Sequence, residues 1–188
     1  MVFQQLLIGV ALGFALQIVF DALGLAGQLL ANSMGLSFAF NVDPLRGSST
    51  PALGQLYIIL ATLTFLALGR PCSRCIELLV AGLYALAHRR RPGLGQEGLW
   101  ALIIWGGQLF AGAIAVALPG ITALLIVNLA FGVVSRAAPA LNLFAVGFPV
   151  SLVVGLLVVL AGIGPMQESF TTLLAQGFEF LRSLHGGP

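Results

Sequence analysis

Charged residues are scarce in this 188-residue chain, and lysine is absent altogether. Only 7% of the residues are charged, and every basic residue is an arginine. Without lysine there is no Gly-x-x-x-x-Gly-Lys-Ser/Thr phosphate loop, which P-loop ATP-driven motors require. A net charge of +2 spread along the chain is also too small to make a nucleic-acid surface. The sequence therefore excludes a P-loop motor and predicts no nucleic-acid partner.

Cysteine and histidine are nearly missing, with two residues of each. Cys72 and Cys75 form a single Cys-x-x-Cys pair, whereas a structural zinc site needs four ligands. His88 and His185 fall in charged or terminal segments, so neither is placed as a base beside a nucleophile. The carboxylates form no i, i+3 or i, i+4 pair. We therefore predict no catalytic residue, no metal site and no cofactor, and the chain is not expected to be an enzyme.

Long hydrophobic runs are what the chain does contain. Hydrophobic residues make up 59% of it, and the mean hydropathy is +1.07. Such a composition is typical of an integral membrane protein or of one assembled in the membrane. The first run follows Met1 directly, without a charged segment before it or a small-residue cleavage site after a short apolar core. A removable signal peptide is therefore not predicted.

The runs in the first half of the chain predict helices. Residues 2–31 and 51–69 are each long enough to cross a bilayer, whereas residues 76–87 are too few. Asp21 falls inside the first run. A single acid in a membrane helix is either a proton or ion site, or it is hydrogen-bonded to a neighbouring helix or lies near the helix end.

The second half of the chain completes an all-α pattern. No charge occurs between Glu97 and Arg136, and Pro119-Gly120 near the middle predicts either a bent long helix or a tight hairpin. Residues 141–163 are apolar enough to insert as a further helix. After Gly164-Pro165, apolar residues recur on one helical face. This tail predicts a separate amphipathic helix that lies on a membrane surface, on a partner subunit or on its own protein.

Small residues recur at helical spacing in the first and last membrane runs. They let another backbone approach closely, so they predict tightly packed helices rather than helices bathed in lipid. In the first run they are Gly9, Gly13, Gly24 and Gly27; in the last they are Gly147, Ser151 and Gly155, bordered by Pro149.

Two polar segments rich in proline and glycine interrupt the runs, at residues 34–51 and 135–149. Hydrocarbon cannot hydrate irregular backbone, so such a break must be sheltered by protein or must line a wet cavity. A secondary transporter also builds its binding site from broken helices, but it usually shows paired repeats and buried ionisable residues. This chain has no convincing repeat and only Asp21 as a candidate, which leaves a small-solute secondary transporter as the alternative hypothesis.

A series of spaced blocks over most of residues 2–165 resembles one known family. The blocks are IGVALGF (8–14), AGQ (26–28), MGLSFA (34–39) with Asp43-Pro44, WGGQLF (105–110), ALP (117–119), NLAFG (128–132), SRAAP (135–139) with Leu141-Asn142, and FAVGFP (144–149). Together they are similar to the FliR family of flagellar biosynthesis proteins. The last block resembles the flagellar branch more than its relatives in virulence type III secretion.

The resemblance implies a subunit of the flagellar type III protein export gate, through which unfolded flagellar proteins are exported. In that family a single-copy chain closes a ring with FliP and FliQ subunits and works beside FlhB and FlhA. The complex belongs to the bacterial inner membrane, at the flagellar basal body, where membrane lipid surrounds part of it. The expected fold is all-α and membrane-assembled, with helical hairpins, kinked long helices and an internal plug-like loop.

The resemblance also implies a division of the chain and roles for its residues. Residues 1–69 are the remainder of a FliP-like half with loop 34–51, residues 70–98 are a polar connector, and residues 99–188 are a FliQ-like hairpin with the amphipathic C-terminal helix. The loop helps plug the pore through an apolar constriction, with a plain interhelical connector as the alternative. Its predicted plug residues are Met34, Leu36, Phe38, Phe40, Asp43 and Pro44. The predicted subunit-packing residues are Gly9, Gly13, Arg136, Pro139, Asn142, Gly147, Pro149, Ser151 and Gly155.

Two features depart from the family pattern. Family members carry apolar helices upstream of the first block, so this chain is expected to be an N-terminally shortened or wrongly started member. Within residues 70–92 the family has a Leu-Pro-Ile-Gly-like turn, where this chain has a basic run that the positive-inside rule would place in the cytoplasm. Codons for residues 86–89, read one base later, can encode Leu-Pro-Ile-Gly, and we therefore hypothesise a compensated reading-frame slip there.

Overall fold

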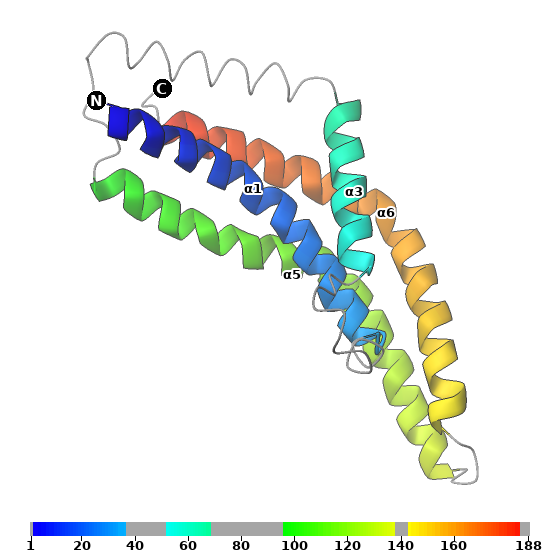
Figure 1. Ribbon diagram of the computed structural model, residues 1–188. Coiled ribbons are helices and arrows are strands. Elements are labelled where there is room, and N and C mark those ends of the chain that lie inside the picture. The colour runs from blue at the N-terminus through cyan, green and yellow to red at the C-terminus, as the bar shows by residue number, and fades with distance from the viewer. Residues whose placement is uncertain (1, 37–51, 69–95, 138–142, 185–188) are drawn as a thin grey trace, which may run out of the picture.

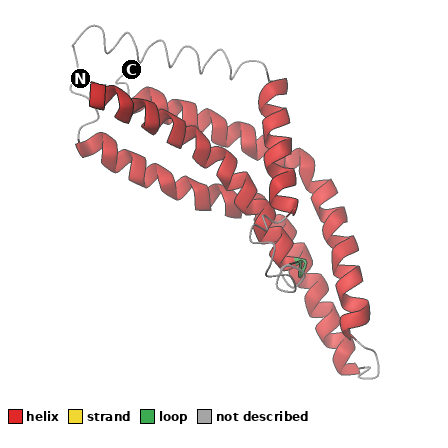
Figure 2. Ribbon diagram, in the orientation of Figure 1, coloured by secondary structure: helices red, strands yellow, loops and turns green. Residues whose placement is uncertain are grey.

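The computed structural model describes residues 2–36, 52–68, 96–137 and 143–184 of the chain. Every regular element in these ranges is an α-helix, and Figure 2 shows no strand among them. The helices are α1 (Val2–Ser33), α3 (Ala52–Ala67), α5 (Gln96–Ala137) and α6 (Leu143–Leu184). The predicted all-α fold is confirmed for this part of the chain.

Helix α1 is the element on which the other three pack. It contacts α3, α5 and α6. In Figure 1 it runs beside the N-terminal half of α5, α3 crosses it, and α6 returns along α5 in the opposite direction. Past the end of α1, the C-terminal part of α5 and the N-terminal part of α6 continue as a two-helix hairpin. The α5–α6 hairpin therefore has a half packed against α1 and a distal half beyond it.

Helix α5 passes through Pro119 without interruption. Its 42 residues make a helix about 63 Å long at 1.5 Å per residue, and Figure 1 shows that it changes direction part-way along. Proline removes one backbone hydrogen bond and crowds the preceding turn, so a bend is the expected result. Of the two alternatives predicted here, the bent long helix is confirmed and the tight hairpin is wrong.

Helix α6 also runs through two prolines, Pro149 and Pro165, over 42 residues. The amphipathic tail predicted after Gly164-Pro165 is therefore not a separate helix, because the apolar and amphipathic parts form one continuous helix. The amphipathic pattern itself is confirmed, and the apolar face packs on the chain's own core rather than on a membrane surface or a partner. The buried residues of this face are Met166, Phe170, Leu174, Phe178 and Leu181. Buried side chains before and after Pro165, such as Val159 and Met166, stabilise the continuous helix there.

Helix α3 is shorter than the sequence predicted. It has 16 residues, about 24 Å, against a hydrocarbon thickness of about 30 Å. Three helices of the described part are long and apolar enough to cross a membrane, over Gly9–Ser33 in α1, Trp100–Val134 in α5 and Gly147–Leu181 in α6. The short apolar run at 76–87 lies outside the described residues.

Aromatic side chains join α1 to its neighbours at two points. Phe20 of α1 makes edge-to-face contacts with Phe65 of α3, at a centroid distance of 5.7 Å, and with Phe170 of α6, at 5.4 Å. Trp105 of α5 stacks on Phe180 of α6 with centroids 4.7 Å apart, and its indole N–H donates to the carbonyl oxygen of Ala15 in α1 at 3.3 Å. Aromatic pairs of this geometry add about 0.5–1.5 kcal/mol each beyond the area that they bury.

Glycines bring α1 and α3 into backbone contact. A Cβ built on Gly27 would lie 2.6 Å from the carbonyl oxygen of Leu53 and 2.8 Å from the Cα of Gly54. A Cβ on Gly54 would lie 3.0 Å from the carbonyl oxygen of Gly24. The close packing predicted from the spacing of Gly24 and Gly27 is confirmed, and the helix that approaches is α3 of the same chain.

We predict that Gly27→Ala lowers the free energy of unfolding by about 1–3 kcal/mol. The added methyl group meets backbone atoms of α3, which cannot move aside as a side chain can. Thermal unfolding of the detergent-solubilised protein measures the effect. Gly13→Ala is the matched control, because nothing lies within 4 Å of a Cβ at that position. Equal unfolding midpoints for the two variants would contradict the backbone contact.

Candidate functional site

The predicted plug loop begins at a sharply defined helix end. The amide of Leu36 donates to the carbonyl oxygen of Ala31 at 3.1 Å, and the amide of Gly35 donates to that of Asn32 at 3.1 Å. This pair of bonds is the Schellman motif, and the residue at its turn is Gly35 with a φ of 78°. Glycine adopts a left-handed conformation without the steric penalty of a Cβ. Of the predicted break at residues 34–51, the described part is this turn at residues 34–36.

Met34, the residue before this turn, is buried and only 1% exposed. Its side chain lies on Gly155 of α6, where a Cβ would be 2.7 Å from the methionine Sδ. The absence of a side chain at Gly155 therefore leaves space for the methionine side chain, which is long and flexible and fills irregular gaps well. In this conformation Met34 anchors α1 to α6 through the protein core.

The other predicted plug residues divide into two groups. Leu36 is half-buried and packs against the core cluster that contains Ala31 and Met34. This contact is the apolar one that usually accompanies a Schellman motif. The remaining four, Phe38, Phe40, Asp43 and Pro44, lie outside the described residues.

The predicted subunit-packing glycines differ in what they face. Nothing lies within 4 Å of a Cβ at Gly9, Gly13 or Gly147. Within residues 2–36, 52–68, 96–137 and 143–184, no neighbour fills these positions. By contrast, Gly155 is occupied by Met34, so the close partner predicted for it is a residue of the same chain.

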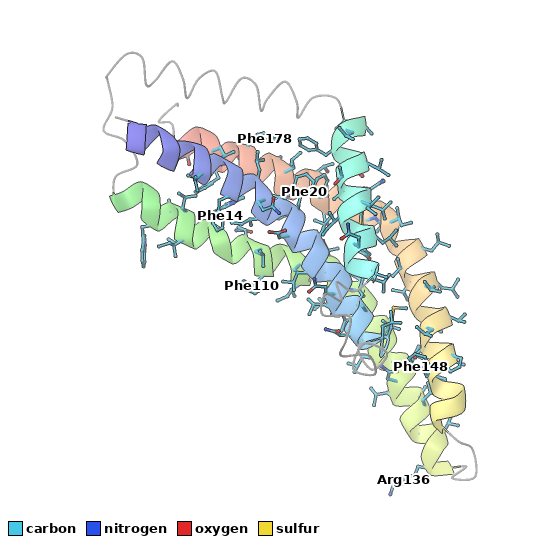
Figure 3. The ribbon with its side chains drawn as sticks, viewed as in Figure 1. Phe14, Phe20, Phe110, Arg136, Phe148 and Phe178 are labelled. Atoms are coloured by element: carbon cyan, nitrogen blue, oxygen red, sulfur yellow. The ribbon has the colours of Figure 1, made fainter. Side chains whose placement is uncertain are left out.

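Three of the remaining packing candidates are described, and they lie on the distal half of the hairpin. Ser151 is buried, and its hydroxyl donates to the carbonyl oxygen of Phe148 at 2.9 Å. Pro149 is exposed. Arg136 is also exposed, in the last turn of α5, and Figure 3 shows it at the tip of that helix. A cation there is favourable beside the free carbonyl groups of a helix C-terminus. Pro139 and Asn142 lie outside the described residues.

Two further glycine contacts were missed by the sequence analysis. A Cβ on Gly120 would lie 2.5 Å from a methyl carbon of Leu30 in α1 and 3.1 Å from one of Val158 in α6. A Cβ on Gly112 would lie 2.9 Å from a methyl carbon of Leu173 in α6. The available signal was the Pro119-Gly120 pair, which was interpreted only as a bend in a long helix or as a tight hairpin. Its glycine also makes room where α1, α5 and α6 meet.

Ionisable groups in the described part are few and scattered. Asp21 of α1 is exposed and accepts one hydrogen bond from Nε2 of Gln17 at 3.0 Å. Glu168 and Glu179 of α6 are exposed as well. The described residues contain no group of three or more histidine, cysteine, aspartate or glutamate residues that could hold a metal ion. The described part of the chain therefore brings no ionisable side chains together into a cluster.

Large apolar side chains are exposed along most of α5. They begin at Trp100, which is 64% exposed, and continue to Val133, which is 69% exposed. A second group lies on the distal half of α6, from Phe148 to Leu160. A soluble monomer rarely exposes apolar surface of this extent, so these faces meet lipid or other protein.

Comparison with known proteins decides the family. The profile of "Bacterial export proteins, family 1" matches residues 1–177. The chain belongs to this family. The resemblance drawn from the spaced sequence blocks is thereby confirmed.

Relatives of this export family include proteins named flagellar biosynthetic protein FliR. The chain is 41% identical to the one from Escherichia coli (strain K12) over 81% of its length. It is also 41% identical to the one from Pectobacterium carotovorum subsp. carotovorum over 82% of its length, and 27% identical to that of Bacillus subtilis (strain 168) over 97%. The chain spans 58% of the length of the first two relatives and 71% of the third.

We predict that Met34 and Gly155 are energetically coupled. Gly155→Ala forces the methionine out of its seat and should lower the free energy of unfolding by about 1–3 kcal/mol. Met34→Ala leaves a cavity and should lower it by about 2–5 kcal/mol. The double variant should lose less than the sum, by about 0.5–3 kcal/mol, because the alanine methyl group takes up part of the vacated space. Denaturant unfolding of the four proteins tests this, and strict additivity would contradict the contact.

Proposed function

We propose that this chain is a subunit of the flagellar type III protein export gate in the bacterial inner membrane, at the flagellar basal body. The family match over residues 1–177 and the names of the FliR relatives support this function. The chain's role is structural, because it contributes helices to a pore and the energy for export comes from its partners. Unfolded flagellar proteins are the cargo.

The exposed apolar strip on α5 is the observation that carries the proposal. From Trp100 to Val133 it follows about 50 Å of helix at 1.5 Å per residue. Hydrocarbon is about 30 Å thick, and even if both parts of the bent helix tilt by the largest usual angle of about 40°, it covers only about 39 Å of helix. The rest of the strip needs protein neighbours. This requirement favours a membrane-assembled complex, with part of the hairpin outside the bilayer, over a small-solute transporter acting alone.

The partners that fit these surfaces are the FliP-like and FliQ-like gate subunits, with FlhB and FlhA beside them. In this proposal residues 1–69 act as the remainder of a FliP-like half, residues 70–98 as a connector and residues 99–188 as a FliQ-like hairpin. Gly9, Gly13 and Gly147 support it, because each leaves room for a neighbouring backbone that the described part of the chain does not supply.

The segment that follows α1 is proposed to act as the plug. Its start is fixed by the capping hydrogen bonds of Gly35 and Leu36 and by the burial of Met34. Phe38 and Phe40 are the candidates for an apolar constriction that seals the pore against small ions. Leu36 and Met34 anchor its first residues in the core.

We predict that the chain co-purifies in single copy with the FliP-like and FliQ-like subunits of the same organism. Mass measurement of the purified complex gives the stoichiometry. Gly147→Leu should lower the recovered partner subunits about tenfold by overpacking an open contact surface. Gly164→Leu is the matched control on the same helix, also with open space around it, and should keep recovery near the unchanged level. A folded chain that purifies alone and carries a small solute into liposomes would refute the proposed function.

We predict that Phe38→Ser with Phe40→Ser raises the ion conductance of the assembled gate in planar bilayers. Polar side chains hydrate a constriction that phenylalanine keeps dry. The control pair, Phe38→Leu with Phe40→Leu, keeps the constriction apolar and should leave conductance low. Both pairs spare Leu36 and the cap of α1. If the serine variant has the same conductance as the unchanged gate, the segment is a plain interhelical connector.

A further inference from the structure

Helices α5 and α6 each contain a proline at the same level of their hairpin. Two contacts join the helices in this region: the side chain of Leu173 lies at Gly112, and that of Val158 lies at Gly120. Pro119 of α5 and Pro165 of α6 both lie between these two contacts. Figure 1 shows that both helices change direction part-way along, in the same sense. The residues beyond the prolines, 120–137 of α5 and 143–164 of α6, therefore form one arm of the hairpin.

Both helices lose hydrogen bonds at the base of this arm. Proline has no amide hydrogen, and a helical amide donates to the carbonyl group four residues before it. Ala115 of α5 and Ala161 of α6 therefore lose their usual donors. In α6 the same stretch contains Gly162 and Gly164, which are poor helix formers, and no described neighbour lies within 4 Å of a Cβ at either position. At this level neither helix has a complete set of hydrogen bonds with which to hold the other at one angle.

Helix α1 reaches past the prolines and contacts the arm at two distances from them. Leu30 lies at Gly120, directly beside the bend. Met34 lies at Gly155, ten residues or about 15 Å of helix from Pro165. A rotation of the arm by about 10° at the prolines would leave the first contact nearly in place and move Gly155 by about 2.6 Å. Since Met34 is only 1% exposed, such a shift must displace its side chain or the end of α1.

We infer that Pro119 and Pro165 form one hinge in the hairpin, and that Met34 transmits movement of the arm to the end of α1. Backbone contact with α3 holds α1 at Gly27, so its last two turns are the part that can follow the arm. Met34 ends these turns, directly before the left-handed residue Gly35. The hinge itself needs no assembled gate. Its consequence for the plug, which is proposed to start at this turn, rests on the proposed function.

Distances between two spin labels in the detergent-solubilised full chain test the hinge. Ile104→Cys and Leu129→Cys carry the labels, on either side of Pro119 and about 37 Å of helix apart. Both positions are 62% exposed, so the labels disturb no core contact. Serine replaces Cys72 and Cys75, which would otherwise react with the label. We expect a broad distribution of distances in this chain, because the arm takes up a range of angles.

Variants at the base of the arm should narrow that distribution. Pro119→Ala with Pro165→Ala restores both amide donors and should reduce its width at least about twofold. Gly162→Ala with Gly164→Ala keeps both prolines, meets no neighbour and should reduce the width about 1.5-fold by stiffening α6. Pro149→Ala is the matched control: it removes a proline within the arm, where α5 has no second proline opposite, and should leave the width unchanged.

A second pair of labels tests transmission to α1. Asn32→Cys marks the end of α1 and Gln176→Cys marks α6 on the other side of the hinge, and both positions are exposed. The double proline variant should narrow this distribution together with the first. Either Met34→Ala or Gly155→Ala should abolish that response at the second pair, because each breaks the contact between α1 and the arm.

Three outcomes are decisive. If the first distribution is as narrow in the unchanged chain as in the double proline and double glycine variants, the bend is fixed and the inference is overturned. If the first distribution narrows in these variants and the second does not, α1 does not follow the arm and transmission through Met34 is overturned. Narrowing of both, lost when the contact is broken, supports the inference. None of these measurements needs a partner subunit, so failure of the gate to assemble would remove the proposed function and leave the hinge standing.

Discussion

Close approach of helices to α1 is the constraint on which this fold depends. In a bilayer the hydrophobic effect does not drive helices together, so van der Waals contact has to hold them. Within two turns α1 meets all three neighbours: Gly27 lies against the backbone of α3, Leu30 fills the space at Gly120 of α5, and Met34 fills the space at Gly155 of α6. A Cβ on Gly27 would meet the backbone of α3, and a Cβ on Gly120 or Gly155 would displace the side chain of Leu30 or Met34.

Because these contacts are concentrated near the end of α1, only one half of the α5–α6 hairpin is covered by another helix of the described chain. The half beside α1 is closed by buried side chains such as Trp105, Phe170 and Phe178. The distal half has no third helix in the described part of the chain, and it exposes residues such as Leu129, Val133 and Leu157. One chain therefore contains a self-supporting packed half and a half whose burial depends on its surroundings.

The sequence predicted the structure correctly where a local residue pattern determines which side of a helix is packed. The spacing of Gly24 and Gly27 predicted close packing, and the apolar face after Pro165 predicted the buried side of α6. The sequence was not informative where contacts between distant residues decide the structure. Burial of Met166 and Phe170 carries α6 through Pro165, although the change of pattern there predicted a separate tail helix. Spacing alone also could not assign Gly155 to Met34, because the two residues are far apart in the chain.

The end of α1 joins the packing of the fold to the proposed plug. Met34 is held in the core by Gly155, and the next residue, Gly35, makes the left-handed turn that ends the helix. The amide of Leu36 is bonded back to Ala31, and its side chain packs against the same core. The segment that follows therefore starts from a point fixed relative to both α1 and α6. A plug segment that starts there is held in place by the packed half of the molecule. A connector that starts from a frayed helix end would have no fixed position in the pore.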